Sequence, residues 1–220
     1  ATVHGLIGIY YMHKGETSKA IEYSENAFKA SEELKDVEIA APIARGLTVA
    51  YQQAGKFIEI IDIAPNVVDA LEKAKKECEF FGAPFNTYSL LCSYYGLSLS
   101  MTGQFKKAGE YFKKCFNVLL SINHLSSLGV AAAMRGLSFV AKGDGANVIK
   151  QFKKSIKYFE EGRTVLIFGV IWSGLGSGYY YLGDLETAKK YIEKGLGLTI
   201  EGGSAWWKSF HYLYLSKTYY

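Results

Sequence analysis

The residue types that most often perform catalysis are few and scattered in this chain. Its four histidines share no HExxH motif and no neighbouring carboxylate pair; they are His4, His13, His124 and His211. Its three cysteines form no CxxC pair and have no histidine at metal-ligand spacing; they are Cys78, Cys92 and Cys115. The sequence therefore predicts no catalytic residues, no metal site and no cofactor, and indicates that the protein is not an enzyme.

The cysteines also bear on the compartment. An odd number of thiols, which we place in helical apolar patterns, is typical of small core side chains in a reducing environment. This favours a cytoplasmic protein.

Two further patterns resemble anion-binding features. Gly174, Gly176 and Gly178 suggest a phosphate loop, but they fall in an expected helix with no preceding strand, so close helix packing is the better interpretation. The second pattern is a set of lysines at matching positions, Lys113, Lys114, Lys153, Lys154 and Lys194. Glutamates lie beside these lysines, which favours a solvated outer face and makes nucleic acid an unlikely partner.

Composition and charge set broad limits. Hydrophobic residues make up 49% and charged residues 21% of the 220 residues, as expected for a globular chain. Residues 1–100 hold 9 Lys and Arg against 13 Asp and Glu, whereas residues 101–220 hold 16 against 8. No run approaches 18 uninterrupted apolar residues, so we predict no membrane span.

The elements that must position any site are indicated by five regularly spaced glycines. Each follows about 15 mostly apolar residues, and their separations are 40, 48, 40 and 40 residues; they are Gly15, Gly55, Gly103, Gly143 and Gly183. Seven residues earlier a small residue usually lies between large ones, and a second small residue usually follows each glycine by five. Each unit is therefore predicted to be a helix, a tight glycine turn and an antiparallel second helix.

This pattern resembles tetratricopeptide repeats. The best match runs through Leu175, Gly176, Tyr179, Gly183, Ala188 and Tyr191, and a second through Tyr95, Gly96, Leu99, Gly103, Ala108 and Phe112. The period of about 40 is longer than the roughly 34 residues typical of the family, and is similar to helical regions of bacterial multidomain regulators. The resemblance implies an all-α fold, a right-handed α-solenoid of antiparallel helix hairpins with about five repeats plus a partial sixth.

The expected organisation is a single solenoid domain over residues 1–220, a fragment of a longer protein because both ends fall inside amphipathic stretches. Its repeats are predicted at 1–36, 37–83, 84–123, 124–162 and 163–202, with a partial repeat at 203–220. The last helix would lack a covering partner, so we expect self-association through it.

The second unit is longer than the others and contains Pro65. A proline inside a helix costs about 3 kcal/mol, so we predict a short helix over 56–63, a break, and a helix over 65–81 packed through Ala70 and Ala74. The insertion is either a tolerated surface change or a feature that shapes a partner site or a bend in the superhelix.

In such stacks the first helix of each repeat lines the concave groove. The positions just before the turn glycines predict the lining, which is mildly apolar with aromatic and amide groups: Ile9, Met12, His13, Arg45, Val49, Gln52, Gln53, Leu97, Met101, Leu137, Ser177, Tyr180 and Tyr181. Several of these side chains could instead simply pack.

The resulting hypothesis is a non-catalytic protein–protein interaction scaffold or regulatory module that binds a peptide or a partner domain in this groove. The partner could be a neighbouring domain of the same chain. The alternative is a small-ligand sensor domain of a bacterial transcription activator or signalling enzyme, suggested by Tyr180, Tyr181, Gln52, Gln53 and Trp206.

Overall fold

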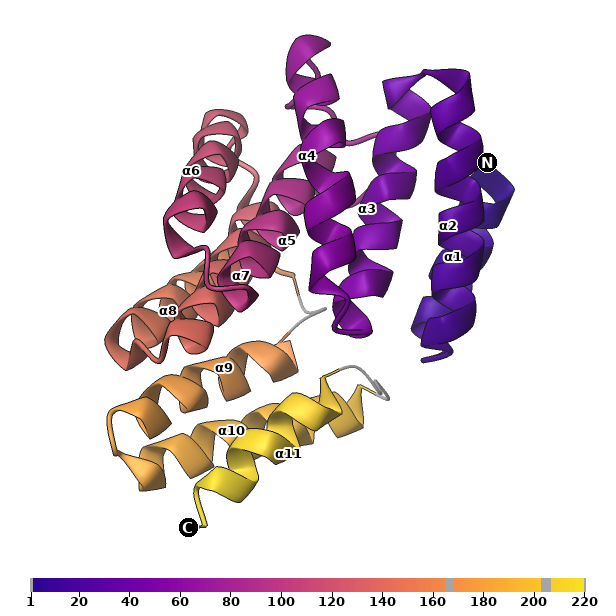
Figure 1. The fold of residues 1–220 in the computed structure, drawn as a ribbon. Coiled ribbons are helices and arrows are strands. Elements are labelled where there is room, and N and C mark those ends of the chain that lie inside the picture. Colours follow the sequence, from indigo (N-terminus) through magenta and orange to yellow (C-terminus); the bar gives the residue numbers. More distant parts are fainter. Residues whose placement is uncertain (1, 165–167, 203–206, 220) are drawn as a thin grey trace. The chain divides into compact units, whose positions relative to one another are not determined.

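The computed structural model describes residues 2–164, 168–202 and 207–219, and within these ranges the chain forms helices and no strand (Figure 1). The helices are α1 (Thr2–His13), α2 (Thr17–Leu34), α3 (Val37–Gln53), α4 (Phe57–Lys73), α5 (Thr87–Met101), α6 (Phe105–Ile122), α7 (Leu125–Lys142), α8 (Gly145–Glu161), α9 (Phe168–Tyr181), α10 (Leu185–Glu201) and α11 (Lys208–Lys217). Ten of them form five successive hairpins, so the predicted all-α hairpin array is confirmed.

The chain divides into two compact units, residues 1–123 with α1–α6 and residues 124–220 with α7–α11. Both units follow one packing rule. The first helix of a hairpin packs on its own second helix, on the second helix of the preceding hairpin and on the next first helix, as α3 does with α4, α2 and α5 and as α9 does with α10, α8 and α11. The first helices therefore form the central layer of each unit.

The same hydrogen bond closes each of the five turns. The five turn glycines all have positive φ, between 70° and 80°, which a residue without a Cβ adopts freely. The next backbone N–H then donates to the carbonyl five residues back, as from Asp144 to Phe139 at 3.0 Å and from Gln104 to Leu99 at 2.7 Å. This is the 6→1 bond of a Schellman motif, and it confirms the glycines as turn formers.

Close approach of helices explains the small residues seven positions before the turns. A Cβ at Gly136 would lie 2.7 Å from the Phe152 ring, and one at Gly176 would lie 2.7 Å from Ile192 Cγ1. The large residue is in each case on the partner helix of the same hairpin. In the second repeat Thr48 takes the place of the glycine, and the residue at the position equivalent to Phe152 and Ile192 is small, Ala64; both are fully buried.

The predicted break at Pro65 is wrong, because α4 continues through this residue from Phe57 to Lys73. Its buried stripe explains this: Ile60, Val68 and Leu71 are fully buried and Val67 nearly so. At about 1.5–3 kcal/mol for each buried aliphatic side chain, this packing exceeds the proline cost of about 3 kcal/mol.

Consequently no helix reaches residue 81, and Ala74 is exposed rather than packed. The extra length of this unit forms a non-helical segment over residues 74–86. Asn86, fully buried, anchors it: its side-chain amide donates to the carbonyls of Glu77 at 2.9 Å and Glu79 at 3.2 Å, while its Oδ1 accepts from the Ser89 N–H at 2.8 Å. One side chain thus caps α5 and fixes the segment before it.

Candidate functional site

In the first unit, the predicted groove residues lie on three helices that pack side by side, α1, α3 and α5. Ile9, Met12, Arg45, Gln52 and Gln53 are half-buried there. Of the others, Met101 is exposed, whereas Val49 and Leu97 are buried. The side chain of His13 lies outside the described residues.

In the second unit, the predicted residues lie on α7 and α9, which also pack together. Leu137 and Ser177 are buried, and the Ser177 hydroxyl donates to the Gly174 carbonyl at 2.7 Å. Tyr180 and Tyr181 are half-buried.

These two tyrosines contact other parts of the protein. The Tyr181 hydroxyl donates to the Val140 carbonyl at 3.1 Å and lies 3.1 Å from the Tyr214 hydroxyl, so it joins α7, α9 and α11. The Tyr180 ring is edge-to-face with that of Tyr214, with centroids 6.1 Å apart. The aromatic groups that suggested a ligand sensor are thus engaged in packing, and Trp206 lies outside the described residues; the sensor alternative is not favoured.

Arg45 and Gln53 differ from the rest of the set. In the described part of the chain, the buried Arg45 Nε and Gln53 Nε2 atoms have no hydrogen-bond partner. The Arg45 guanidinium also forms no ion pair with a described carboxylate, and burial lowers its pKa. An unpaired buried donor costs about 1–3 kcal/mol, and helix α3 carries two donors that no described residue satisfies.

The structure also places the cysteines and the lysine set that were noted in the sequence. Cys92 and Cys115 are buried, and burial raises the pKa of Cys115 to about 12, so this thiol is protonated at neutral pH. Cys78, expected in a helix, is exposed in the 74–86 segment. Of the lysine set, Lys114 pairs with Glu72 at 2.8 Å and Lys194 lies over the Trp172 ring.

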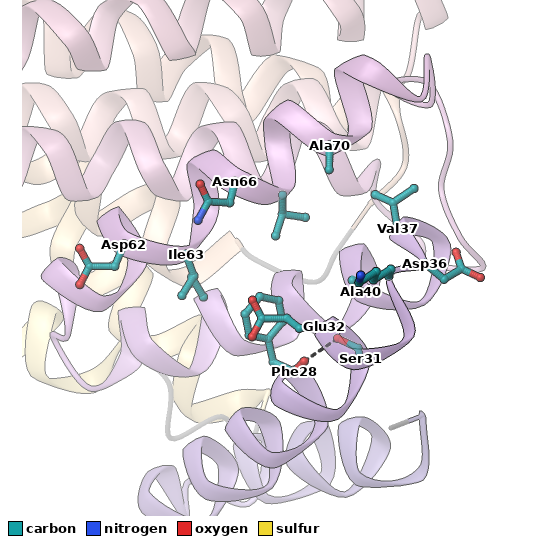
Figure 2. Close-up of a pocket in the computed structure, with 12 residues that line it drawn as sticks. Phe28, Ser31, Glu32, Asp36, Val37, Ala40, Asp62, Ile63, Asn66 and Ala70 are labelled. Atoms are coloured by element: carbon teal, nitrogen blue, oxygen red, sulfur yellow. Dashed lines mark hydrogen bonds between the residues drawn. The ribbon is translucent and has the colours of Figure 1, made fainter.

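A cavity that the sequence did not predict lies between α2, α3 and α4, with a volume of about 270 Å³ (Figure 2). Apolar side chains from all three helices form its base. Phe28 of α2 and Val67 of α4 are buried there, and Val37 of α3 and Ile63 of α4 are half-buried.

Polar residues surround this base. Three carboxylates, Glu32, Asp36 and Asp62, line the cavity together with a single amine, Lys35, and the amide of Asn66. All five residues are exposed. The sequence contained a signal for this site, since Asp62, Ile63, Asn66 and Ala70 follow helical spacing, but the wrongly predicted break at Pro65 divided them between two helices.

Among the residues that the structure describes, no group of three or more His, Cys, Asp or Glu side chains is placed to hold a metal ion. Within the same ranges, no helix is both long and apolar enough to cross a membrane.

Five tandem helix hairpins with recurring glycine turns define a helical repeat protein. Residues 171–199 match the model of the tetratricopeptide repeat family. No curated protein matches the chain. The match falls on α9 and α10, so the fifth hairpin is similar to a tetratricopeptide repeat, a kind of repeat that generally mediates protein–protein contacts.

Solved structures share this fold at low sequence identity. The crystal structure of BtubC (BKLC) from P. vanneervenii is similar over 91% of this chain and 80% of that one, with a TM-score of 0.65 and 11% identity. Two crystal structures of nearly identical TPR-like repeats, assigned to a kinesin light chain of Podosopora anserina, have TM-scores of 0.58 and 0.57. Their identities are 13% and 14%; they cover 92% and 91% of this chain, and this chain covers 95% of each.

Proposed function

We propose that this protein is an interaction scaffold or regulatory module that binds an extended peptide, from another protein or a neighbouring domain, along the first-helix face of its repeats. The observation that carries the proposal is the pair of buried, unpaired donors on α3, at Arg45 and Gln53. A peptide backbone presents carbonyl acceptors at regular intervals, so it is suited to satisfy both donors.

Apolar contacts support the same face of the first unit. Ile9 and Met12 of α1 are half-buried, and Met101 of α5 is 48% exposed. Methionine adapts its shape to different partners, and it is common on surfaces that bind peptides. Donors on α3 between apolar side chains on α1 and α5 would fix the peptide backbone while its side chains find apolar contacts.

The test separates binding from stability. We would select 16-residue peptides from a random phage library on the wild-type protein and measure the tightest by fluorescence anisotropy. Arg45→Met should raise its Kd at least tenfold, because a hydrogen bond to a charged group contributes about 1.5–3 kcal/mol. The midpoint of thermal unfolding should stay unchanged or rise, since the substitution removes an unpaired buried cation.

Lys29→Met is the matched control, because it removes one positive charge from an exposed site on α2. Binding to this variant should equal that of the wild type. If Arg45→Met binds as tightly as wild type, or if the selection yields no peptide, the proposal fails.

A further inference from the structure

We infer that the cavity between α2 and α4 is a second docking site, separate from the first-helix face, for a basic amphipathic segment of a protein partner. One apolar side chain of that segment enters the cavity, and lysine or arginine residues on either side of it meet the carboxylates around the opening.

The size of the cavity favours a side-chain anchor. Its volume of about 270 Å³ lies below the roughly 300–1,000 Å³ of typical small-molecule pockets. Its base is apolar, formed by Phe28, Val37, Ile63 and Val67, and Figure 2 shows Phe28, Val37 and Ile63 on three different helices. Such a cavity takes one or two apolar side chains of an amphipathic helix, as in helix-in-groove recognition.

The charges around the opening determine whether a basic or an acidic segment is bound. Three carboxylates and one amine line it, and the carboxylates of Glu32 and Asp62 form no hydrogen bond or ion pair with the described residues. Asp36 accepts the Glu38 N–H at 2.9 Å through one oxygen. A segment with lysine or arginine beside its anchor therefore gains attraction to these carboxylates, while an acidic segment is repelled.

The lysine-rich helix α8 of a second copy is a poor occupant. Val148, Phe152 and Phe159 of α8 are at most 1% exposed, Ile156 is 8% exposed, and Ile149 and Tyr158 are half-buried within their own unit. This helix therefore offers lysines without an exposed apolar anchor, and the occupant we infer is a segment of a different protein.

The experiment uses a panel of labelled 15-residue amphipathic peptides. The residue at the anchor position is Ala, Leu or Phe, and the flanking charged positions are all Lys, all Gln or all Glu. Fluorescence anisotropy on the whole protein should give the tightest binding for Leu or Phe with Lys. Methyl resonances of Val37, Ile63 and Val67 should shift on titration with that peptide.

Two double variants with the same net charge locate the site. Glu32→Lys with Asp62→Lys reverses two carboxylates at the cavity and should weaken binding at least tenfold. Glu33→Lys with Asp69→Lys reverses two exposed carboxylates that do not line it, and should leave binding within about twofold of wild type. Ala70→Phe, which fills the cavity from α4, should also abolish binding.

Three results would overturn this inference: no binding by any peptide, a preference for Glu-flanked peptides, or equal weakening in the two double variants. Arg45→Met should leave binding of the Lys-flanked peptide unchanged. Failure of this site and failure of the first-helix face are therefore distinguishable.

Discussion

His211 is the residue whose environment most constrains its protonation state. It is fully buried on α11, with Nδ1 2.5 Å from the Ser173 hydroxyl and Nε2 2.9 Å from the Thr199 hydroxyl. Both hydroxyl oxygens also lie within hydrogen-bonding distance of backbone carbonyls, those of Ile192 and Gly195. The neutral imidazole, with one donor and one acceptor, can bond both hydroxyls without a charge.

This environment predicts an acid-sensitive contact between α11 and the helices α9 and α10. Burial lowers the pKa of His211 from 6.5 to about 4, so the folded protein binds fewer protons than the unfolded chain between these pH values. The contribution of neutral His211 to the free energy of unfolding is fully present above pH 6.5. It is lost as the pH falls through 4, and the difference is about 3 kcal/mol. Urea unfolding followed by circular dichroism from pH 7 to 4 should show this loss.

His211→Gln is the control, since its amide donates and accepts but does not titrate in this range. Its stability should vary much less between pH 6.5 and 4.5. Below pH 4.5, protonation of carboxylates whose pKa is lowered by their partners, such as Glu16 and Asp144, should destabilise both proteins alike. Parallel pH profiles for the two proteins down to pH 4.5 would contradict the assignment.

At the scale of the element, the Asn86 side chain fixes the non-helical 74–86 segment to the start of α5. It donates two hydrogen bonds into the 74–86 segment and accepts one at the start of α5. Asn86→Ala should lower the free energy of unfolding by about 2–4 kcal/mol, since it removes a cap worth about 1 kcal/mol and two further hydrogen bonds worth about 0.5–1.5 kcal/mol each. Chemical denaturation measures this loss.

Asn86→Asp separates the two roles of the side chain. An aspartate still accepts the Ser89 N–H but cannot donate to Glu77 and Glu79. Hydrogen exchange should therefore accelerate in residues 74–86 of this variant while the first turn of α5 keeps its protection. Equal protection of the 74–86 segment in wild type and Asn86→Asp would contradict the role assigned to the side-chain amide.

The hairpins could be predicted from the sequence because their determinants are local. A glycine such as Gly143 specifies its own turn, and the apolar periodicity before and after it specifies two helices. The continuous helix through Pro65 could not be predicted from the sequence. It depends on burial of Ile60, Val68 and Leu71 against α3 and α5, and a rule based on local sequence does not include the energy of this packing.

The candidate sites, too, could be predicted only where their determinants are local in the sequence. Repeat geometry placed Arg45 and Gln53 on the face of the first helices, but only the structure shows that their buried nitrogen atoms lack partners. The cavity between α2 and α4 was missed, because the wrongly predicted break at Pro65 divided its α4 residues and the remaining lining residues come from α2, α3 and the turn between them.

At the scale of the whole molecule, helices that contact one another within a unit are close in the sequence. Within each of the two units, no contact between described helices joins helices more than two positions apart in chain order. Stability in such an array is approximately a sum of terms within repeats and between neighbours. A local perturbation should therefore act mainly on the helices that contact it.

Gly136→Ala tests this locality, because its Cβ would meet the Phe152 ring, which also packs against Gly174 of α9. Overpacking costs about 1–3 kcal/mol, and the gain in helix propensity offsets up to about 1 kcal/mol of it. Hydrogen exchange should accelerate in α7, α8 and α9, by about tenfold for each 1.4 kcal/mol lost, and stay unchanged in α1–α4. Gly109→Ala is the matched control: a Cβ at this exposed position of α6 meets nothing within 4 Å, so the substitution should stabilise the helix. Acceleration of similar size in α1–α4 would show that the chain unfolds as one cooperative block, and would contradict the additive description of the array.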